Sequence, residues 1–468
     1  GRSLEDVDAK LSILAVGDDD QNIFRFRGTN VWFIRRFQED YAAEIHYMIE
    51  NYRSTTHIVA ASNALIAANR DRLKIDQPIR VNRNRAGLPP GGRWQHLDPL
   101  GQGSVQCLTV THEVHQAATI VAELLRLQSL DSGFDWQECA VLAREWSVLM
   151  PIRSECEARQ VPLSVVYDAD RQPPVLRIRE NRLFLEALKG KGEALCRATQ
   201  LIALLEELSA DQSGNPWWQQ WRGILSDWEA ESANAELSAR QALEFCYETL
   251  GLQRQERRWG EGLFLSTVHA AKGMEFKHVL IADGGWDRSR SEQTIEEERR
   301  LYYVAMSRAQ ETLCLIQRRD TRNPFPAQLN GDCLQHRSAA PDFLEEHTAA
   351  ILKRRYAVLG LQDLDIGFAG TRPTTDSVHR LLSELWPGSV LELQEFEGHL
   401  YLMCQAAPIA SLSRAAVAVW RERLIRIETI RVLAMIQRYC EDGDAKFRSR
   451  YRTDAWEVPM VEVIYSVL

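Results

Sequence analysis

Apolar runs and stretches of helical spacing alternate along most of the chain. The apolar runs have the length of buried strands, and between them apolar residues recur every three or four positions. Strands are predicted at residues 11–16, 44–49, 105–110, 140–143, 162–166, 263–268, 279–282 and 313–316. Helices are predicted at residues 30–38, 54–69 and 113–130, and in the stretch that ends near residue 159. Strands that alternate with helices in this way predict parallel sheets with right-handed crossovers.

Three other stretches interrupt this alternation. Residues 174–259 have helical spacing and contain several closely spaced tryptophans, which predicts a helical block inserted into the sheet. Residues 78–103 are rich in glycine, proline and arginine and are predicted to be a linker. Helical patterns at residues 342–359 and 415–440 predict a mostly helical C-terminal extension.

Composition narrows the class of protein. A chain of 468 residues is too long for one ordinary core, so about two to four domains are expected. The nine cysteines are scattered without a CxxC pair, which argues against a zinc site or a disulfide framework and favours a reducing cytoplasm. No apolar run approaches the roughly 20 residues that a membrane helix needs, and no signal peptide is predicted. The net charge of −9 gives no general attraction to nucleic acid, so DNA binding would need a local positive groove.

The first candidate chemistry lies between Val16 and Gly28. This stretch follows a predicted strand, and in α/β sheets ligands bind at the carboxyl ends of strands. Gln21 has a neutral amide that can donate to a phosphate oxygen and orient a water molecule. Phe24 and Phe26 are interleaved with arginines and offer flat faces to unpaired bases. An acidic turn followed by a helix with two core phenylalanines is the alternative for this stretch alone.

Three further motifs follow in order. They are NYRS at residues 51–54, TVHAAKGMEF at residues 267–276 and EEERRLYYVAMSRA at residues 296–309. Together with the stretch at residues 16–28, they resemble motifs III to VI of the UvrD/Rep (PcrA-like) superfamily 1 DNA helicases. The resemblance covers roughly residues 10–320.

The resemblance implies a fold. It is an α/β fold of RecA-like parallel sheets, with part of the first and most of the second helicase domain, a helical insertion and a mostly helical C-terminal extension. The implied parts are the C-terminal part of the first RecA-like ATPase domain at residues 1–95, the second RecA-like domain at residues 104–173 and 261–320, the helical insertion at residues 174–260, and an extension of unknown role at residues 321–468.

The resemblance also implies an ATP site. The implied ATP-binding residues are Gln21, Tyr52, Arg53, Gly273, Glu275 and Arg308. Of these, Gln21, Arg53 and Arg308 are the implied catalytic residues, because they would contact the γ-phosphate and the attacking water. Tyr52 would stack on the adenine ring. The alternatives are ordinary surface ion pairs for the two arginines and a core position for the tyrosine.

A second group of residues would face the DNA. The implied DNA-binding residues are Phe24, Phe26, Arg27, Thr267 and His269. Stacking of a base on an aromatic ring contributes about 1–3 kcal/mol. Phe26 replaces the tryptophan often found at this position in the family, which would weaken the stack. His269 could equally be a hydrogen-bonded structural histidine.

Two clusters have ordinary explanations. Asp18–Asp20 suggest a metal site, but the resemblance makes them the acidic turn before Gln21, so no metal-binding residue is expected in this chain. The run Lys446–Arg452 mixes basic and aromatic residues and could touch a nucleic-acid backbone, although a solvated face is the favoured interpretation.

Two motifs of the family are missing from the sequence. There is no GxxxxGK(S/T) loop and no acidic Mg²⁺-binding motif, and both would precede residue 16. Binding of ATP with Mg²⁺ would then depend on a missing N-terminal helicase half, in keeping with a first residue that is not methionine. We therefore expect no ATP hydrolysis by this chain alone.

Two functions are compatible with these motifs. The first is the C-terminal portion of an ATP-dependent 3′–5′ DNA helicase of repair or recombination, which would act on single-stranded and duplex DNA in the bacterial cytoplasm, at the nucleoid. The alternative is a non-catalytic DNA-binding or adaptor protein that retains the helicase fold.

Overall fold

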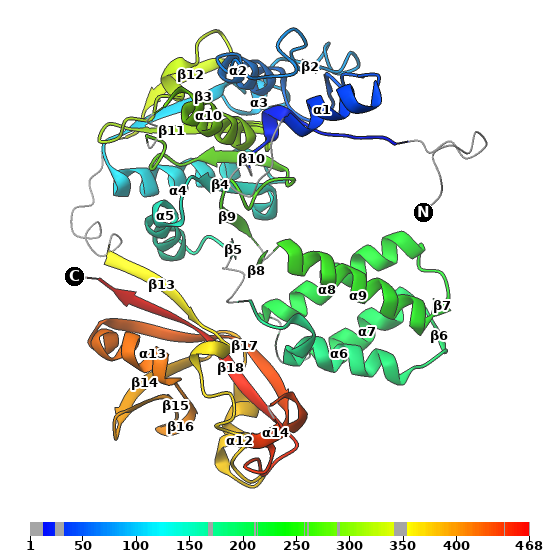
Figure 1. Cartoon of the computed structure of the whole chain (residues 1–468), viewed down its shortest axis with the longest axis vertical. Coiled ribbons are helices and arrows are strands. Elements are labelled where there is room, and N and C mark those ends of the chain that lie inside the picture. Colours follow the sequence, from blue (N-terminus) through cyan, green and yellow to red (C-terminus); the bar gives the residue numbers. More distant parts are fainter. Residues whose placement is uncertain are drawn as a thin grey trace. The chain divides into compact units, whose positions relative to one another are not determined.

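The chain divides into two compact units (Figure 1). The computed structural model describes residues 13–23, 32–166, 172–209, 212, 214–256, 258–259, 262–287, 291–340, 353–443 and 445–467. The first unit consists of Gly1–Ile152 and Ser266–Pro341, and the second of Arg153–Leu265 and Asp342–Leu468.

The first unit contains a parallel sheet. The strands of this unit are β1 (Glu50–Asn51), β2 (Arg80–Val81), β3 (Val105–Val110), β4 (Cys139–Ala143), β10 (Phe276–Ile281), β11 (Ala309–Arg318) and β12 (Leu334–Ser338). Its helices are α1 (Trp32–Tyr41), α2 (Thr56–Ile66), α3 (Trp94–Leu97), α4 (Glu113–Leu130) and α10 (Glu292–Met306). Strands β1 and β2 form a separate pair, and the larger sheet has the order β12-β3-β11-β10-β4. Strand β9 (Leu263–Thr267) and helix α5 (Trp146–Ala158) cross the boundary between the units.

The central strands are apolar on both faces, as expected for a parallel sheet that is covered by helices. Strands β3 and β4 are buried along nearly their whole lengths. The strands predicted at residues 105–110, 140–143, 279–282 and 313–316 are confirmed within a few residues. Helix α4 has the predicted bounds.

The second unit continues the sheet from β9. Strand β5 (Leu163–Val166) pairs in parallel with β9, and β8 (Arg258–Trp259) pairs with β5 in the antiparallel direction. The order from β12 through β4 and β9 to β5 gives seven parallel strands. The α/β class is therefore confirmed.

The block predicted to be helical is helical. It contains α6 (Arg179–Gly190), α7 (Ala198–Leu208), α8 (Pro216–Ser232) and α9 (Ala239–Glu256), with a short pair of strands, β6 (Leu195–Cys196) and β7 (Leu237–Ser238). Three of its tryptophans, Trp218, Trp221 and Trp228, lie in one core cluster. The indole of Trp221 donates to Asn181 Oδ1 at 2.9 Å. These rings thus build the core of the helical block.

The prediction of a mostly helical C-terminal extension was wrong. An antiparallel sheet with the order β13-β18-β17-β14-β15-β16 occupies this part. Its strands are β13 (Arg354–Leu359), β14 (Val390–Phe396), β15 (His399–Cys404), β16 (Ala407–Ser411), β17 (Ile427–Tyr439) and β18 (Ala455–Ser466). The helices here are α12 (Ser377–Glu384), α13 (Arg414–Trp420) and α14 (Ala445–Arg448). Residues 427–439 contain a continuous apolar run, and periodicity alone does not distinguish such a run from a buried helix.

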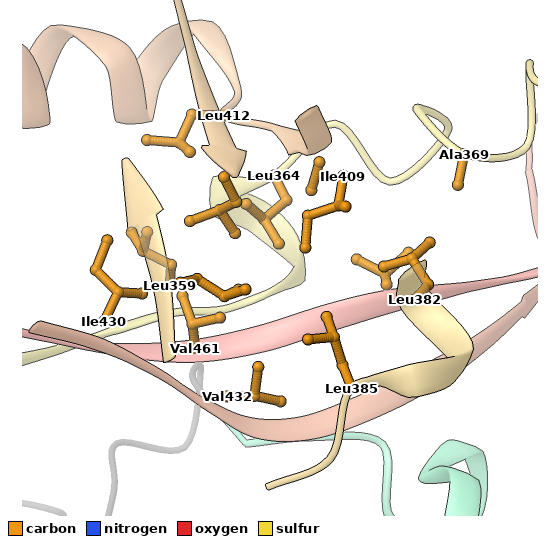
Figure 2. Close-up of a cluster of buried hydrophobic side chains, with 14 of the residues drawn as sticks. Leu359, Leu364, Ala369, Leu382, Leu385, Ile409, Leu412, Ile430, Val432 and Val461 are labelled. Carbon is orange, nitrogen blue, oxygen red and sulfur yellow. The ribbon is translucent and has the colours of Figure 1, made fainter. Parts of the chain in front are cut away.

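Figure 2 shows the core that the C-terminal sheet encloses. Ile430, Val432 and Val461 point into it from β17 and β18. Leu382 and Leu385, at the end of α12, fill it from the side. The apolar run that was predicted to be part of a helix lies in β17, which pairs with β18 along most of its length.

Two N-terminal predictions are also corrected. Residues 13–16 form no strand, and Leu14 is 89% exposed. No described segment pairs with them, and an apolar run becomes a buried strand only when neighbouring strands accept its backbone hydrogen bonds. The strand predicted at residues 44–49 is not found, because these residues form no regular element and β1 begins only at Glu50.

The stretch predicted to be a linker, residues 78–103, is folded. It contains β2 and α3, and Trp94 is fully buried with its indole donating to Glu311 Oε2 at 2.7 Å. Gly103 has a φ of +68°, and a Cβ at this position would lie 2.4 Å from the carbonyl oxygen of Gly91. Gly91 and Gly103 therefore allow two backbone segments to pack closely, and Gly103 also allows a left-handed turn.

A network of buried ion pairs joins α5 to the C-terminal sheet within the second unit. Glu462 on β18 is 1% exposed and accepts from Arg153 Nη2 at 2.8 Å and from Arg431 Nε at 2.9 Å. Glu157 accepts from Arg431 Nη2 at 2.8 Å and from Arg153 Nε at 3.3 Å. The guanidinium of Arg153 also lies 3.8 Å from the centre of the Tyr356 ring.

The helical block is attached to the same sheet. The indole of Trp217 on α8 donates to the carbonyl of Leu433 on β17 at 3.0 Å. Arg179, at the start of α6, donates to Glu457 Oε1 on β18 at 2.6 Å. Helical block and C-terminal sheet are therefore parts of one folded unit. Within the described residues, no helix combines the length and the apolar character that crossing a bilayer requires.

His278 on β10 is expected to make stability depend on pH. Burial lowers the pKa of its imidazole from 6.5 to about 4, and its ring lies 5.2 Å from that of Phe134. Between these two values the unfolded chain binds a proton that the folded protein excludes, so stability falls as the pH decreases from 6.5 to 4. We expect the wild type to lose about 3 kcal/mol more than the His278→Gln variant over this range.

Urea denaturation at a series of pH values measures this difference. His96→Gln, at an exposed position of the same unit, is the control and should follow the wild type. Parallel pH profiles for wild type and His278→Gln would contradict the expectation.

Candidate nucleotide-phosphate site

Arg308 lies in the turn between α10 and β11, at the amino edge of the parallel sheet. Its side chain donates to four neutral oxygens. They are Val304 O at 3.0 Å, Met274 O at 3.2 Å, Ser307 Oγ at 3.0 Å and Gln21 Oε1 at 3.1 Å. Burial, followed by the charge of Arg53, lowers the pKa of the guanidinium. The carboxylates of Glu275 and Asp18 oppose this shift from a distance, while the described hydrogen-bond partners of Arg308 are all neutral. An anion in direct contact would stabilise the buried cation further.

Arg53 lies at the same edge. The side-chain oxygen of Asn51 accepts from the backbone N–H of Arg53 at 2.9 Å and of Ser54 at 2.8 Å, which forms a tight turn after β1. The hydroxyl of Ser54 donates to the carbonyl of Ala309, the first residue of β11, at 2.7 Å. The guanidinium of Arg53 is paired with the carboxylate of Glu275.

The pairing of β10 with β11 explains why these residues meet. Phe276 and Ala309 are register partners, and the N–H of Phe276 donates to the carbonyl of Arg308 at 2.9 Å. Glu275 and Arg308 each directly precede one of these partners. The structure thus brings the two implied phosphate-binding arginines, Gln21 and Glu275 together.

An open pocket of about 420 Å³ adjoins Arg53. It is lined by Glu50, Asn51, Tyr52, Arg53, Glu275 and Gln310. Tyr52 is 67% exposed, so the core position considered for it is excluded. Its hydroxyl donates to Glu50 Oε2 at 2.7 Å, which raises the pKa of Tyr52 and, with a second hydrogen bond from Asn82, lowers the pKa of Glu50. The free faces of the ring can stack on a planar base.

Gln21 ends a short acidic turn that is fixed by basic side chains. Its amide donates to Asp18 Oδ2 at 2.8 Å, while its oxygen accepts from Arg308. The buried Asp20 accepts two hydrogen bonds from Arg72, at 2.7 and 2.8 Å. Lys74 Nζ lies 2.5 Å from Asp18 Oδ1.

The acidic turn is a poor fit for a divalent cation. The carboxylate oxygens of Asp18, Asp19 and Asp20 lie within 4.8 Å of one another. However, Arg72 and Lys74 already neutralise two of them, and the backbone N–H of Leu73 donates to Asp19. Mg²⁺ would have to displace these cations, so we assign no metal role to the turn.

The implied DNA-binding residues Thr267 and His269 lie at the other edge of the sheet. The N–H of Val268 donates to the carbonyl of Ala143, the last residue of β4, at 3.0 Å. From this carboxyl edge, residues 268–275 return to the amino edge, where Glu275 begins the approach to β10. Gly273 has a φ of +91°, which favours glycine at this bend. One connection therefore joins the candidate DNA residues to the candidate phosphate residues.

The remaining DNA candidates, Phe24, Phe26 and Arg27, lie outside the described residues. Their role stays a prediction.

Sequence analysis missed two supporting residues, Arg72 and Lys74. Arg72 and Lys74 follow α2 in a segment without a motif, and only the structure brings them to the acidic turn. Within the motif at residues 296–309, Glu298 is bound by Arg144 through two hydrogen bonds of 2.8 Å, and Arg299 is buried against the Asn69 side chain. These contacts hold the scaffold around Arg308.

Residues 50–95 belong to the first compact unit. They share it with β3, β4, β10 and β11, and α2 packs against α10 and β11.

The protein thus has an α/β fold with two clustered arginines, Arg53 and Arg308, at the amino edge of its sheet. The model of the UvrD-like helicase C-terminal domain matches residues 222–320, which include Glu275 and Arg308. The chain is thus related to the UvrD-like superfamily 1 helicases.

Individual relatives agree with this relationship. The ATP-dependent DNA helicase UvrD2 of Mycobacterium tuberculosis is 27% identical over 330 residues, which cover 65% of this chain and 43% of the relative. DNA helicase II of Escherichia coli is 26% identical over 390 residues (65% and 51%), and the ATP-dependent DNA helicase PcrA of Bacillus subtilis is 24% identical over 405 residues (69% and 55%). The chain spans about half the length of these relatives.

Proposed function

We propose that this chain supplies one wall of the ATP site of a DNA helicase that moves 3′ to 5′ in repair or recombination. The observation that carries the proposal is the buried guanidinium of Arg308, held by Gln21 and other neutral groups, beside Arg53. Hydrolysis of ATP requires charge neutralisation around the γ-phosphate and a positioned water molecule. Two arginines and a glutamine amide at one sheet edge suit both requirements.

ATP would change the partners of these side chains. Arg53 would exchange the carboxylate of Glu275 for phosphate oxygens, and Arg308 would add a charged acceptor to its neutral ones. For Arg53 one anionic partner would replace another, whereas the buried Arg308 would gain an anionic partner that its described hydrogen bonds do not supply, and this gain favours the exchange. Glu275, released from Arg53, would face the ribose, and the exposed ring of Tyr52 would stack on the adenine.

The same exchange would reach the DNA through residues 268–275. This connection carries Glu275 at one end, contains His269 near the other end and directly follows Thr267, the last residue of β9. Movement of Glu275 would therefore be transmitted across the sheet to the proposed single-strand path. Phe24 and Phe26 would supply the stacking faces of that path.

ATP is the substrate of this proposed reaction, and Mg²⁺ would neutralise its phosphates when bound. The acidic turn does not fit the cation, so we assign its ligands to a segment that carries a P-loop. The sequence of this chain contains no such loop. Without a backbone cradle for the β- and γ-phosphates, turnover should collapse.

The purified chain is expected to release no phosphate from ATP above background, with or without single-stranded DNA. A coupled phosphate-release assay measures this, and a P-loop helicase from among the relatives serves as the positive control. DNA-stimulated release that disappears in the Arg308→Ala variant would overturn the proposal that this chain supplies only one wall of the ATP site.

A further inference from the structure

A segment just beyond α2 joins the acidic turn to the helix that leads to Arg308. We call residues 69–74 the connecting segment. Its last three residues contact the three aspartates of the turn one by one, in opposite chain directions. The contacts are Arg72 with Asp20 at 2.7 and 2.8 Å, the backbone N–H of Leu73 with Asp19 Oδ2 at 2.5 Å, and Lys74 Nζ with Asp18 Oδ1 at 2.5 Å. Each carboxylate of the turn thus has a partner of its own in the connecting segment.

The first half of the connecting segment is held by α10. Four hydrogen bonds join the two, namely Asn69 Nδ2 to Glu296 O at 3.0 Å, Arg70 N to Glu296 Oε1 at 2.8 Å, Arg299 Nη1 to Asn69 Oδ1 at 2.5 Å, and Arg300 Nη2 to Asp71 O. Helix α10 ends at Met306, two residues before Arg308. The connecting segment is therefore fixed at one end to the helix that positions Arg308 and at the other end to the turn that carries Gln21.

The contact of Lys74 with Asp18 bears directly on the side chain of Gln21. One oxygen of Asp18, Oδ1, lies against Lys74, while the other, Oδ2, accepts from the amide nitrogen of Gln21 at 2.8 Å. The amide oxygen of Gln21 accepts from Arg308 at 3.1 Å. A carboxylate only accepts and a guanidinium only donates, so a single orientation of the Gln21 amide satisfies both neighbours.

A second lysine also faces Asp18. Burial, followed by the charge of Arg308, lowers the pKa of Lys272, and the charge of Asp18 opposes this shift. Lys74 differs from Lys272 in its direct contact with Asp18 and in lying 3.7 Å from Asp20 Oδ2. Removal of Lys74 would therefore leave Asp18 partly compensated and would loosen its carboxylate without removing every cation around the turn.

We propose that Lys74 is a positioning residue for Gln21. It holds the Asp18 carboxylate, which in turn keeps the amide oxygen of Gln21 directed toward Arg308. This inference rests on the proposed function, in which Gln21 orients the attacking water. An amide oxygen can accept a proton from that water, whereas a flipped amide would present only N–H donors. A group that is already aimed at the reacting atoms costs no reorganisation in the transition state.

Nuclear magnetic resonance of the full chain, with ¹⁵N in the glutamine side chains, tests the orientation without any nucleotide. The signals of Gln21 are those that Gln21→Ala lacks. Lys74→Met should shift both amide protons of Gln21 toward the values of exposed glutamines and speed their exchange with water several-fold, whereas Lys74→Arg should retain the wild-type signals. The matched control is Lys277→Met, which removes a lysine from another ion pair of the same unit, 2.6 Å from Glu138.

Turnover tests the consequence for the reaction, in the chain joined to a segment that carries a P-loop. Lys74→Met should lower kcat about 10-fold and leave KM for ATP nearly unchanged. The loss is smaller than the roughly 10²-fold effect of a misplacement of about 1 Å, because Lys272 still faces Asp18. In a Gln21→Ala background Lys74→Met should have no further effect, because a positioning residue acts only through the residue that it positions. A merely structural role would lower turnover equally in both backgrounds.

The proposal is supported if Lys74→Met alters the Gln21 signals and lowers kcat only when Gln21 is present, and if Lys74→Arg behaves as the wild type in both measurements. Unchanged Gln21 signals, an equal change in Lys277→Met, or equal losses of turnover in the two backgrounds would overturn it. If the methionine variant does not fold, Lys74→Ala, which leaves room for water, is judged by the same criteria. Wild-type turnover in Gln21→Ala itself would overturn the proposed function of Gln21, and the spectra of the full chain distinguish that failure from a failure of Lys74 to orient the amide.

Discussion

Joined to a segment that carries a P-loop, the Arg308→Ala variant is expected to lose about 10³-fold or more of its DNA-stimulated ATP turnover. Arginines that stabilise the transferring phosphoryl group contribute about 10³–10⁵ to the turnover rate. Arg308 fits this role because its guanidinium is buried and its described partners are all neutral. The loss should appear in the turnover number, since the charge being neutralised develops in the transition state.

Two further variants separate catalysis from folding. Arg308→Lys keeps the charge but loses the planar fork, so it should remain strongly impaired. Arg319→Ala removes an exposed arginine just beyond the other end of β11 and should leave turnover unchanged. Steady-state phosphate release with saturating DNA provides the rates, and circular dichroism checks the fold. Wild-type turnover in a folded Arg308→Ala protein would rule out the assigned role.

Replacing Glu462 by glutamine is expected to lower the free energy of unfolding by about 3 kcal/mol. Removal of one partner from a buried ion pair costs about 3–5 kcal/mol, because a charge is left buried without compensation. Arg153 and Arg431 both lose their contact with a carboxylate that is 1% exposed. Glu157 still contacts both arginines, which keeps the expected loss at the lower end of the range.

The matched control is Glu428→Gln on the same sheet. Glu428 pairs with Arg354, and both side chains are 32% exposed, so the loss should stay below about 1 kcal/mol. Urea denaturation monitored by tryptophan fluorescence measures both variants. Equal losses in the two variants would show that the buried network does not join α5 to the C-terminal sheet as strongly as its geometry suggests.

The sheet of the first unit was predictable because burial on both faces leaves its strands as short continuous apolar runs. Strands β3, β4, β10 and β11 show this directly. Helix α4 was predictable for a different reason, the helical spacing of its apolar residues. The C-terminal sheet was not predictable in the same way. Strand β17 carries a continuous apolar run that suits a helix or a strand, and only its long-range pairing with β18 selects the strand.

The residues of the candidate site could be predicted from the sequence, but their position on the sheet could not. Ordered motifs indicated Gln21, Arg53, Glu275 and Arg308, and the structure brings these four together. The carboxyl-end expectation concerned the stretch that contains Gln21, whereas Glu275 and Arg308 directly precede β10 and β11 and therefore lie at the amino edge of the sheet. The support of the acidic turn by Arg72 depends on a contact across 52 positions, which no local pattern reveals.

The central claim is that Arg53 and Arg308 recognise the γ-phosphate. Its most direct test is a comparison of the affinities for a non-hydrolysable ATP analogue and for ADP, by calorimetry on the chain joined to a P-loop segment. The account predicts that the wild type prefers the ATP analogue and that the Arg53→Ala/Arg308→Ala variant binds both nucleotides equally. An undiminished preference for the ATP analogue in the folded double variant would contradict it.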